Sequence, residues 1–120
     1  MTRTPRPGRA VRGSRTGRPI MALMDLLGRR WALRVIWELR EGRRTFRALQ
    51  EACGGVSPTV LNARLRELRE SGLLDSAGTD GYGLTARGRE LIEQFLPLVD
   101  WSTRWAAAVT RARGSPRSSR

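Results

Sequence analysis

The sequence contains no lysine, no histidine and a single cysteine, Cys53. Without histidine the chain cannot form the Ser-His or Cys-His pairs of nucleophilic enzymes, nor a zinc site of the usual Cys/His type. An intrachain disulfide is excluded too, which is typical of a protein kept in a reducing cytoplasm. The carboxylates are scattered, and none is paired among other catalytic groups. The sequence therefore predicts a cytoplasmic protein that is not an enzyme and uses no metal or cofactor.

Long apolar runs are lacking as well, and no stretch approaches the length of a membrane span, so we expect no membrane partner. Acidic residues are missing from both ends of the chain. Residues 1–19 carry six arginines and residues 111–120 carry four, which leaves only +2 of the net charge of +12 on residues 20–110.

Both ends are also rich in Gly, Pro, Ser and Thr and poor in apolar residues. This composition predicts disordered basic tails at residues 1–19 and 111–120 around one domain over residues 20–110. Mobile guanidinium groups attract a polyanion without reading its sequence, so nucleic acid is the partner that the charge favours.

Within the domain, apolar residues recur at helical spacing in separate segments. They predict helices over residues 20–27, 30–41, 46–53 and 58–71, and a long last helix that begins after Thr85 and kinks at Pro97. Thr45 and Ser57 each precede a helix as an N-cap residue. The glycine-containing turn at residues 54–56 joins the third and fourth helices, which is the arrangement of a helix-turn-helix.

Two short extended segments, 73–76 and 82–85, flank a turn at residues 77–81 that contains Gly78, Asp80 and Gly81. They predict a β-hairpin, and a hairpin directly behind a helix-turn-helix is a wing. The fold class that we expect is therefore mainly α with a small β-hairpin, a winged helix-turn-helix.

Several motifs follow one another in the order typical of a known family. They are the segments 26–31 (LLGRRW), 43–49 (RRTFRAL), 56–68 (VSPTVLNARLREL), 71–74 (SGLL) and 82–91 (YGLTARGREL), followed by Trp101. Over residues 20–106 the chain resembles the HxlR-type winged helix-turn-helix regulators. The resemblance implies a homodimeric transcription regulator, with the first and last helices in the dimer seam.

Two features depart from that family. Many members carry a cysteine just before the first helix, and some use it to sense oxidants or electrophiles, whereas residues 18–21 here read RPIM. The hairpin is acidic, with Asp75 and Asp80 and no arginine between residues 73 and 85. We therefore expect little DNA-binding energy from the wing.

The fourth helix carries the candidates for DNA readout. On a helical wheel Leu61, Leu65 and Leu68 share one face, and the opposite face holds the base-readout candidates Thr59, Asn62, Ala63 and Arg66. Asparagine pairs with adenine and arginine with guanine, while Ala and the Thr methyl suit the thymine methyl group. The alternative is an ordinary solvated face of an amphipathic helix.

Phosphate contacts are expected around the starts of the third and fourth helices. The candidates are Arg43, Arg44, Thr45, Arg47, Ser57 and Arg64. For Arg64 an alternative stays open, in which it holds Glu67, Glu70 or a backbone carbonyl instead.

The four tryptophans Trp31, Trp37, Trp101 and Trp105 are expected in the core and the dimer seam, with a pocket for a flat aromatic effector as the alternative. Cys53 is expected to be a small buried hydrophobe, with redox sensing as its alternative.

Taken together, these features predict a sequence-specific regulator that binds double-stranded DNA as a homodimer on an inverted repeat. The alternative is a winged-helix module for protein interaction or assembly, without specific DNA readout.

Overall fold

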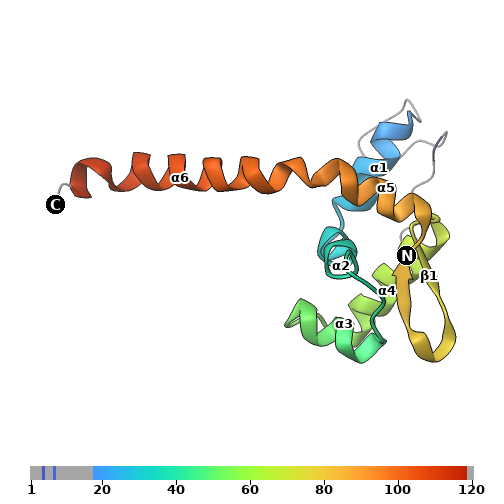
Figure 1. The fold of residues 1–120 in the computed structure, drawn as a ribbon. Coiled ribbons are helices and arrows are strands. Elements are labelled where there is room, and N and C mark those ends of the chain that lie inside the picture. The colour runs from blue at the N-terminus through green and yellow to red at the C-terminus, as the bar shows by residue number, and fades with distance from the viewer. Residues whose placement is uncertain (1–3, 5–6, 8–17, 119–120) are drawn as a thin grey trace. The chain divides into compact units, whose positions relative to one another are not determined.

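A computed structural model describes residues 4, 7 and 18–118 of the chain (Figure 1). Its helices are α1 (Pro19–Leu27), α2 (Ala32–Glu38), α3 (Phe46–Cys53), α4 (Pro58–Glu70), α5 (Ala86–Phe95) and α6 (Pro97–Ser118), with strands β1 (Leu74–Ser76) and β2 (Tyr82–Leu84). The chain divides into two compact units, residues 1–89 and residues 90–120. The prediction of a disordered N-terminal tail falls, except for Thr4, Pro7, Arg18 and Pro19, outside the described residues.

The core of the first unit lies among α2, α3 and α4. Its fully buried side chains are Val35, Ile36, Leu39, Leu49, Leu61, Leu65 and Leu68. Three of them are the leucine stripe of α4, so the inward face predicted for this helix is confirmed. Since that stripe is turned into the core, the opposite face of α4 is left for solvent or a partner.

Local sequence determines where the third and fourth helices start. The Thr45 hydroxyl accepts a hydrogen bond from the Ala48 N–H at 3.1 Å, and the Ser57 hydroxyl accepts one from the Val60 N–H at 3.2 Å. Pro58 occupies the first helical position of α4, where its missing N–H costs nothing. Both predicted N-caps are confirmed, and the predicted bounds of α3 agree with the observed ones.

The second helix is shorter than predicted. It covers Ala32–Glu38, because Trp31 adopts a left-handed backbone with φ of 76° and interrupts the helix that we expected from residue 30. A β-carbon makes this conformation uncommon in any residue but glycine, and for a bulky side chain it is an outlier.

The predicted hairpin is present, with Leu74 opposite Leu84 and Ser76 opposite Tyr82. The end of β2 next to the turn is joined to the α2–α3 connection, because the backbones of Arg44 and Tyr82 exchange two hydrogen bonds of 3.0 and 2.8 Å. A β-carbon at Gly81 would lie 2.2 Å from the Arg44 carbonyl oxygen, so this close approach requires glycine. In Figure 1 the hairpin runs alongside α4, as expected for a wing.

The last helix differs from the prediction of one kinked helix. The chain turns at Leu96, and Pro97 begins the separate helix α6. Proline lacks the N–H that a continuous helix needs, yet it suits a first helical position. At the other end α6 continues to Ser118, so residues 111–118 are helical where we expected a disordered tail.

Candidate nucleic-acid interface

The outward face of α4 carries the four predicted base-readout residues on one side of the helix. Thr59, Asn62 and Arg66 are exposed, and Ala63 is half-buried. The Arg66 side chain is 48% exposed, and its nitrogens reach the carboxylates of Glu67 and Glu70 only at 3.9 and 4.0 Å. Pairs this long and this exposed hold a side chain weakly. The guanidinium group of Arg66 is therefore available to a partner.

The basic residues near the start of α3 fall into two groups. The side chain of Arg47 is 89% exposed and only 3.9 Å from the Glu51 carboxylate. Arg43 instead donates to the Asp75 carboxylate at 2.6 Å and to the Gly81 carbonyl at 3.0 Å. These contacts tie Arg43 to the hairpin, so its charge is partly neutralised by the wing.

The Arg44 side chain is likewise hydrogen-bonded within the protein. Its Nε donates to the Glu38 carbonyl at 2.8 Å, which joins the α2–α3 connection to the end of α2. Thr45 and Ser57 are exposed, and each hydroxyl accepts its capping bond. Each of these hydroxyl protons can still be donated to a phosphate oxygen.

Arg64 forms contacts within the protein, which is the alternative that the sequence left open for this residue. Its Nη1 donates to a Glu67 carboxylate oxygen, and its Nε donates to the Arg30 carbonyl at 2.9 Å. The side chain is only 18% exposed. The guanidinium group of Arg64 is therefore held by contacts within the protein and is not available for a phosphate contact.

The sequence pattern did not predict that the carboxylate of Glu67 in α4 is buried. Glu67 is 4% exposed and accepts a hydrogen bond from Arg29 Nη1 at 2.9 Å as well as the one from Arg64. The three-residue spacing of Arg64 and Glu67 was visible in the sequence, but Arg29 lies 38 residues away from Glu67 and nothing in the pattern joins them.

The four tryptophans do not form one described site. Trp31 and Trp37 belong to the first unit and are half-buried, and the Arg40 guanidinium lies 3.8 Å from the ring centre of Trp37. Trp101 and Trp105 belong to the second unit, where their exposed rings are stacked with centres 5.9 Å apart. In an isolated chain this second pair leaves a large apolar surface in water.

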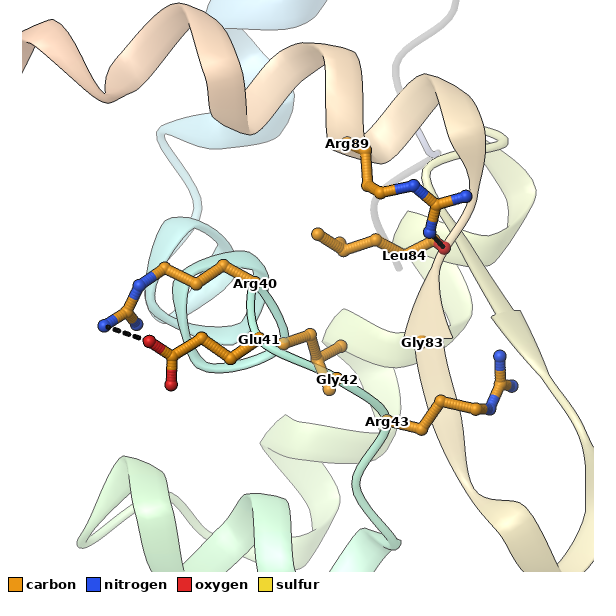
Figure 2. Close-up of a pocket in the computed structure, with 8 residues that line it drawn as sticks. Arg40, Glu41, Gly42, Arg43, Gly83, Leu84 and Arg89 are labelled. Atoms are coloured by element: carbon orange, nitrogen blue, oxygen red, sulfur yellow. Dashed lines mark hydrogen bonds and ion pairs between the residues drawn. The ribbon is translucent and has the colours of Figure 1, made fainter.

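A cavity of about 250 Å³ lies between the end of α2, β2 and the first turn of α5, all within residues 1–89 (Figure 2). The Leu84 side chain points into it, while the Arg40 and Arg43 guanidinium groups lie on opposite sides. Arg40 is 3.7 Å from the Glu41 carboxylate, and Arg89 donates to the Leu84 carbonyl at 3.0 Å. Because these charged groups do not converge, the cavity lacks the arrangement that would bind a small anion.

The Cys53 thiol is buried in the first unit, as expected for a small hydrophobe. Burial raises the pKa of this thiol above its ordinary value, the Glu38 carboxylate adds to the rise, and Arg34 and Arg44 oppose it. A neutral thiol is a poor nucleophile. The prediction of a buried side chain is confirmed, and this environment offers no support for redox sensing.

We therefore expect Cys53 in the native protein to resist iodoacetamide at neutral pH and to react readily once urea unfolds the chain. The stabilisation from the neutral thiol is complete below the ordinary thiol pKa and is lost as the pH rises through the raised pKa of the folded state. Mass spectrometry of the alkylated protein measures the reaction. Equal rates for the native and unfolded protein would contradict the assignment.

Within residues 4, 7 and 18–118, no group of three or more cysteine or acidic side chains is placed to hold a metal ion. In that same part of the chain, no helix has both the length and the apolar character that a membrane span requires.

Comparison with known proteins agrees with this architecture. The profile of the HxlR-like helix-turn-helix family matches residues 26–110. An uncharacterised helix-turn-helix transcriptional regulator of Methanocaldococcus jannaschii is 28% identical over 92 residues, covering 73% of this chain and 86% of that protein. A similar regulator of Synechocystis is 32% identical over 93 residues, covering 72% of this chain and 69% of that protein.

Solved structures extend the likeness to the backbone. The quinone-bound YodB of Bacillus subtilis has a TM-score of 0.65 at 27% identity and covers 71% of this chain and 96% of its own. A MarR-family regulator of Enterococcus faecalis has a TM-score of 0.66 at 26% identity, covering 77% of this chain and 89% of its own. The family and these relatives are transcriptional regulators and not enzymes. The chain belongs to the HxlR-like helix-turn-helix family of transcriptional regulators.

Proposed function

We propose that this protein acts in the cytoplasm as a homodimer that binds double-stranded DNA at an inverted repeat, with α4 in the major groove. The observation that carries the proposal is the division of α4 between a fully buried leucine stripe and an opposite face that holds Thr59, Asn62 and Arg66 in the exposed state. In helix-turn-helix proteins the second helix enters the major groove by its N-terminal residues. Asn62 would pair with adenine and Arg66 with guanine, while Thr59 and Ala63 would contact thymine methyl groups.

Phosphate contacts in this proposal come mainly from Arg47, because it is the most exposed of the arginines around the start of α3. The hydroxyl groups of Thr45 and Ser57 lie at the starts of α3 and α4 and would donate to phosphate oxygens. Arg43 and Arg44 would add positive charge near the phosphates while they keep their hydrogen bonds within the protein.

A second copy of the chain is the partner that the exposed apolar side chains fit. In the first unit Ile20, Met24 and Leu33 are exposed, and in the second unit the exposed set is Leu96, Leu98, Val99, Trp101 and Trp105. Monomeric proteins rarely leave contiguous apolar surfaces of this kind in water. In this proposal Trp101 and Trp105 serve the dimer seam and not an effector pocket, and a two-fold dimer explains why the operator would be an inverted repeat.

One of the similar structures, YodB of Bacillus subtilis, was solved with a bound quinone. We do not transfer a thiol-based form of sensing to this chain, because its single cysteine is the buried Cys53.

Selection of duplexes from a random pool by the full chain tests the proposal. The expected result is an enriched inverted repeat whose half-sites are separated by about one helical turn, bound by two chains in sedimentation equilibrium. Binding of every duplex alike, with no enriched sequence, would reject specific readout and favour the alternative of a protein-interaction module.

The ion pair between Arg43 and Asp75 gives a prediction about the wing. The Asp75 side chain is 51% exposed, so we expect Asp75→Asn to change the free energy of unfolding by no more than about 1 kcal/mol. It should strengthen binding to random-sequence DNA and steepen the log–log salt dependence by about 0.9, since Arg43 becomes free to meet a phosphate. Filter binding across a range of salt concentrations measures both. Asp80→Asn removes the same charge from the hairpin turn, and an equal gain in that variant would show that Arg43 plays no part.

A further inference from the structure

The contact between α1 and the end of α4 is incomplete. A groove of about 410 Å³ separates them, lined mainly by Ala22, Leu23 and Leu26 of α1 and by Glu70, Ser71 and Leu73 at the end of α4. Apolar side chains that leave such a space between two elements cannot interlock along it. Close packing along this groove therefore contributes little to how the end of α4 lies against α1.

A buried polar network joins α1 and the α1–α2 turn to α4. The carboxylate of Glu67 accepts from Arg29 at one oxygen and from Arg64 at the other. Arg29 also reaches the Asp25 carboxylate of α1 at 3.3 Å, and its side chain is only 8% exposed. Two arginines and two carboxylates thus balance their charges, and among the described residues no buried side-chain nitrogen or oxygen is without a partner.

The network also holds the turn between α1 and α2. The Arg30 carbonyl accepts a hydrogen bond from Arg64 of α4 at 2.9 Å, and the next residue, Trp31, has the left-handed φ of 76°. A side chain of this size keeps such a backbone only where its surroundings determine it strongly. The turn and α4 are therefore joined at two points, through Arg29 and through the Arg30 carbonyl.

A buried ion pair contributes little net stability, but charge-assisted bonds to arginine are strongly directional. Glu67 is the neighbour of Arg66 in α4, so their side chains leave the helix about 100° apart. A rotation of α4 that kept its leucines buried would break the bonds of Glu67 at once. Fixing Glu67 therefore fixes the direction in which Arg66, and one turn earlier Asn62, leaves the helix.

We propose that Arg29 and Glu67 are positioning residues for DNA readout, which hold α4 at the rotation where Asn62 and Arg66 meet base edges. This inference rests on the proposed function, because it concerns how the same helix reads DNA. Neither residue contacts the DNA itself in this assignment. Through the pair of Asp25 with Arg29, α1 helps to hold α4 in place.

The test compares specificity with stability in the full chain. Arg29→Met/Glu67→Met replaces the pair by apolar side chains of similar length and leaves the net charge unchanged. Replacing a buried ion pair by apolar side chains is often neutral for stability, and the two partners left behind, Asp25 and Arg64, reach solvent with 16% and 18% of their side chains exposed. We expect an unchanged urea midpoint, unchanged affinity for random-sequence duplex, and a loss of about tenfold or more in the preference for the selected operator, which corresponds to one misplaced bidentate base contact.

Glu67→Gln is the second variant, because it keeps the shape of the side chain. Loss of one charge from a buried pair is destabilising, so urea unfolding measures its folded fraction at the temperature of the DNA titration. We expect it to lose part of the operator preference. Glu41→Gln is the control, since it removes a carboxylate that is 78% exposed and lies 3.7 Å from Arg40, outside α4, and it should keep the full preference. If the double variant and Glu67→Gln both keep the wild-type ratio of operator to random affinity, the positioning role is wrong.

Loss of specific DNA binding and loss of the positioning role give different results. If the wild-type chain selects no sequence from the random pool, the proposed function falls and this inference falls with it. If the wild-type chain selects an operator and the variants lose affinity for operator and random duplexes equally, only the positioning role is overturned.

Discussion

Arg66→Ala is expected to weaken binding to the selected operator by roughly 5- to 150-fold while leaving random-sequence binding nearly unchanged, because a bidentate pair with guanine is worth about 1–3 kcal/mol. The side chain is 48% exposed and its two carboxylate neighbours lie at the limit of an ion pair, so little internal bonding is lost. Replacement of guanine at one operator position should then cost the wild-type protein affinity and cost the variant nothing. Fluorescence anisotropy with matched duplexes measures both losses.

Arg69→Ala is the control for this experiment. Arg69 is exposed in the last turn of the same helix, so its removal takes away the same charge far from the N-terminal half of α4. A phosphate contact would weaken operator and random DNA alike, whereas a base contact would change their ratio. An equal loss on both duplexes in Arg66→Ala would place Arg66 among the phosphate contacts and reject base readout.

Removal of residues 1–17 is expected to weaken binding to every duplex and to flatten its salt dependence. The segment carries five arginines and no acidic residue, and each phosphate contact that is lost should lower the log–log slope by about 0.9, or by up to about 4.5 for all five. The ratio of operator to random affinity should stay the same, because contacts of this kind carry no sequence information. Titrations at several salt concentrations give the slope.

The truncation is designed to spare α1. It keeps Arg18, whose carbonyl accepts hydrogen bonds from the Met21 and Ala22 N–H groups at 2.9 and 3.3 Å. A full-length variant with the same five arginines changed to glutamine separates charge from chain length, and it should show the same slope as the truncated chain. An unchanged slope in both would remove the N-terminal arginines from the binding surface.

Several features of the candidate site could be predicted because their causes are local. Thr45 and Ser57 each cap a backbone N–H three residues further along, and Pro58 marks the first turn of α4. The leucine stripe follows from helical periodicity, which also places Asn62 and Arg66 on the opposite face.

Other features depend on residues that are distant in the chain. The charge and position of Arg43 in the sequence are those of a phosphate contact. In the fold its guanidinium group pairs with Asp75, 32 residues later, which partly neutralises its charge. For Arg64 the sequence offered Glu67, Glu70 or a backbone carbonyl, and only the fold identifies that carbonyl as the one of Arg30, 34 residues earlier. Periodicity reports which face of a helix is buried, but it does not report which charged groups another element brings to that face.

The sequence by itself determined the starts of α3 and α4, the buried face of α4 and the order of elements in the winged helix-turn-helix, because hydrogen bonds and periodicity over three or four residues decide them. The tertiary structure alone decided that Glu67 is buried, that Arg29 pairs with it and that Trp31 adopts a left-handed backbone. A buried charge is tolerated only where the folded chain brings an opposite charge to it. Local sequence patterns do not predict such a contact between residues that are distant in the chain.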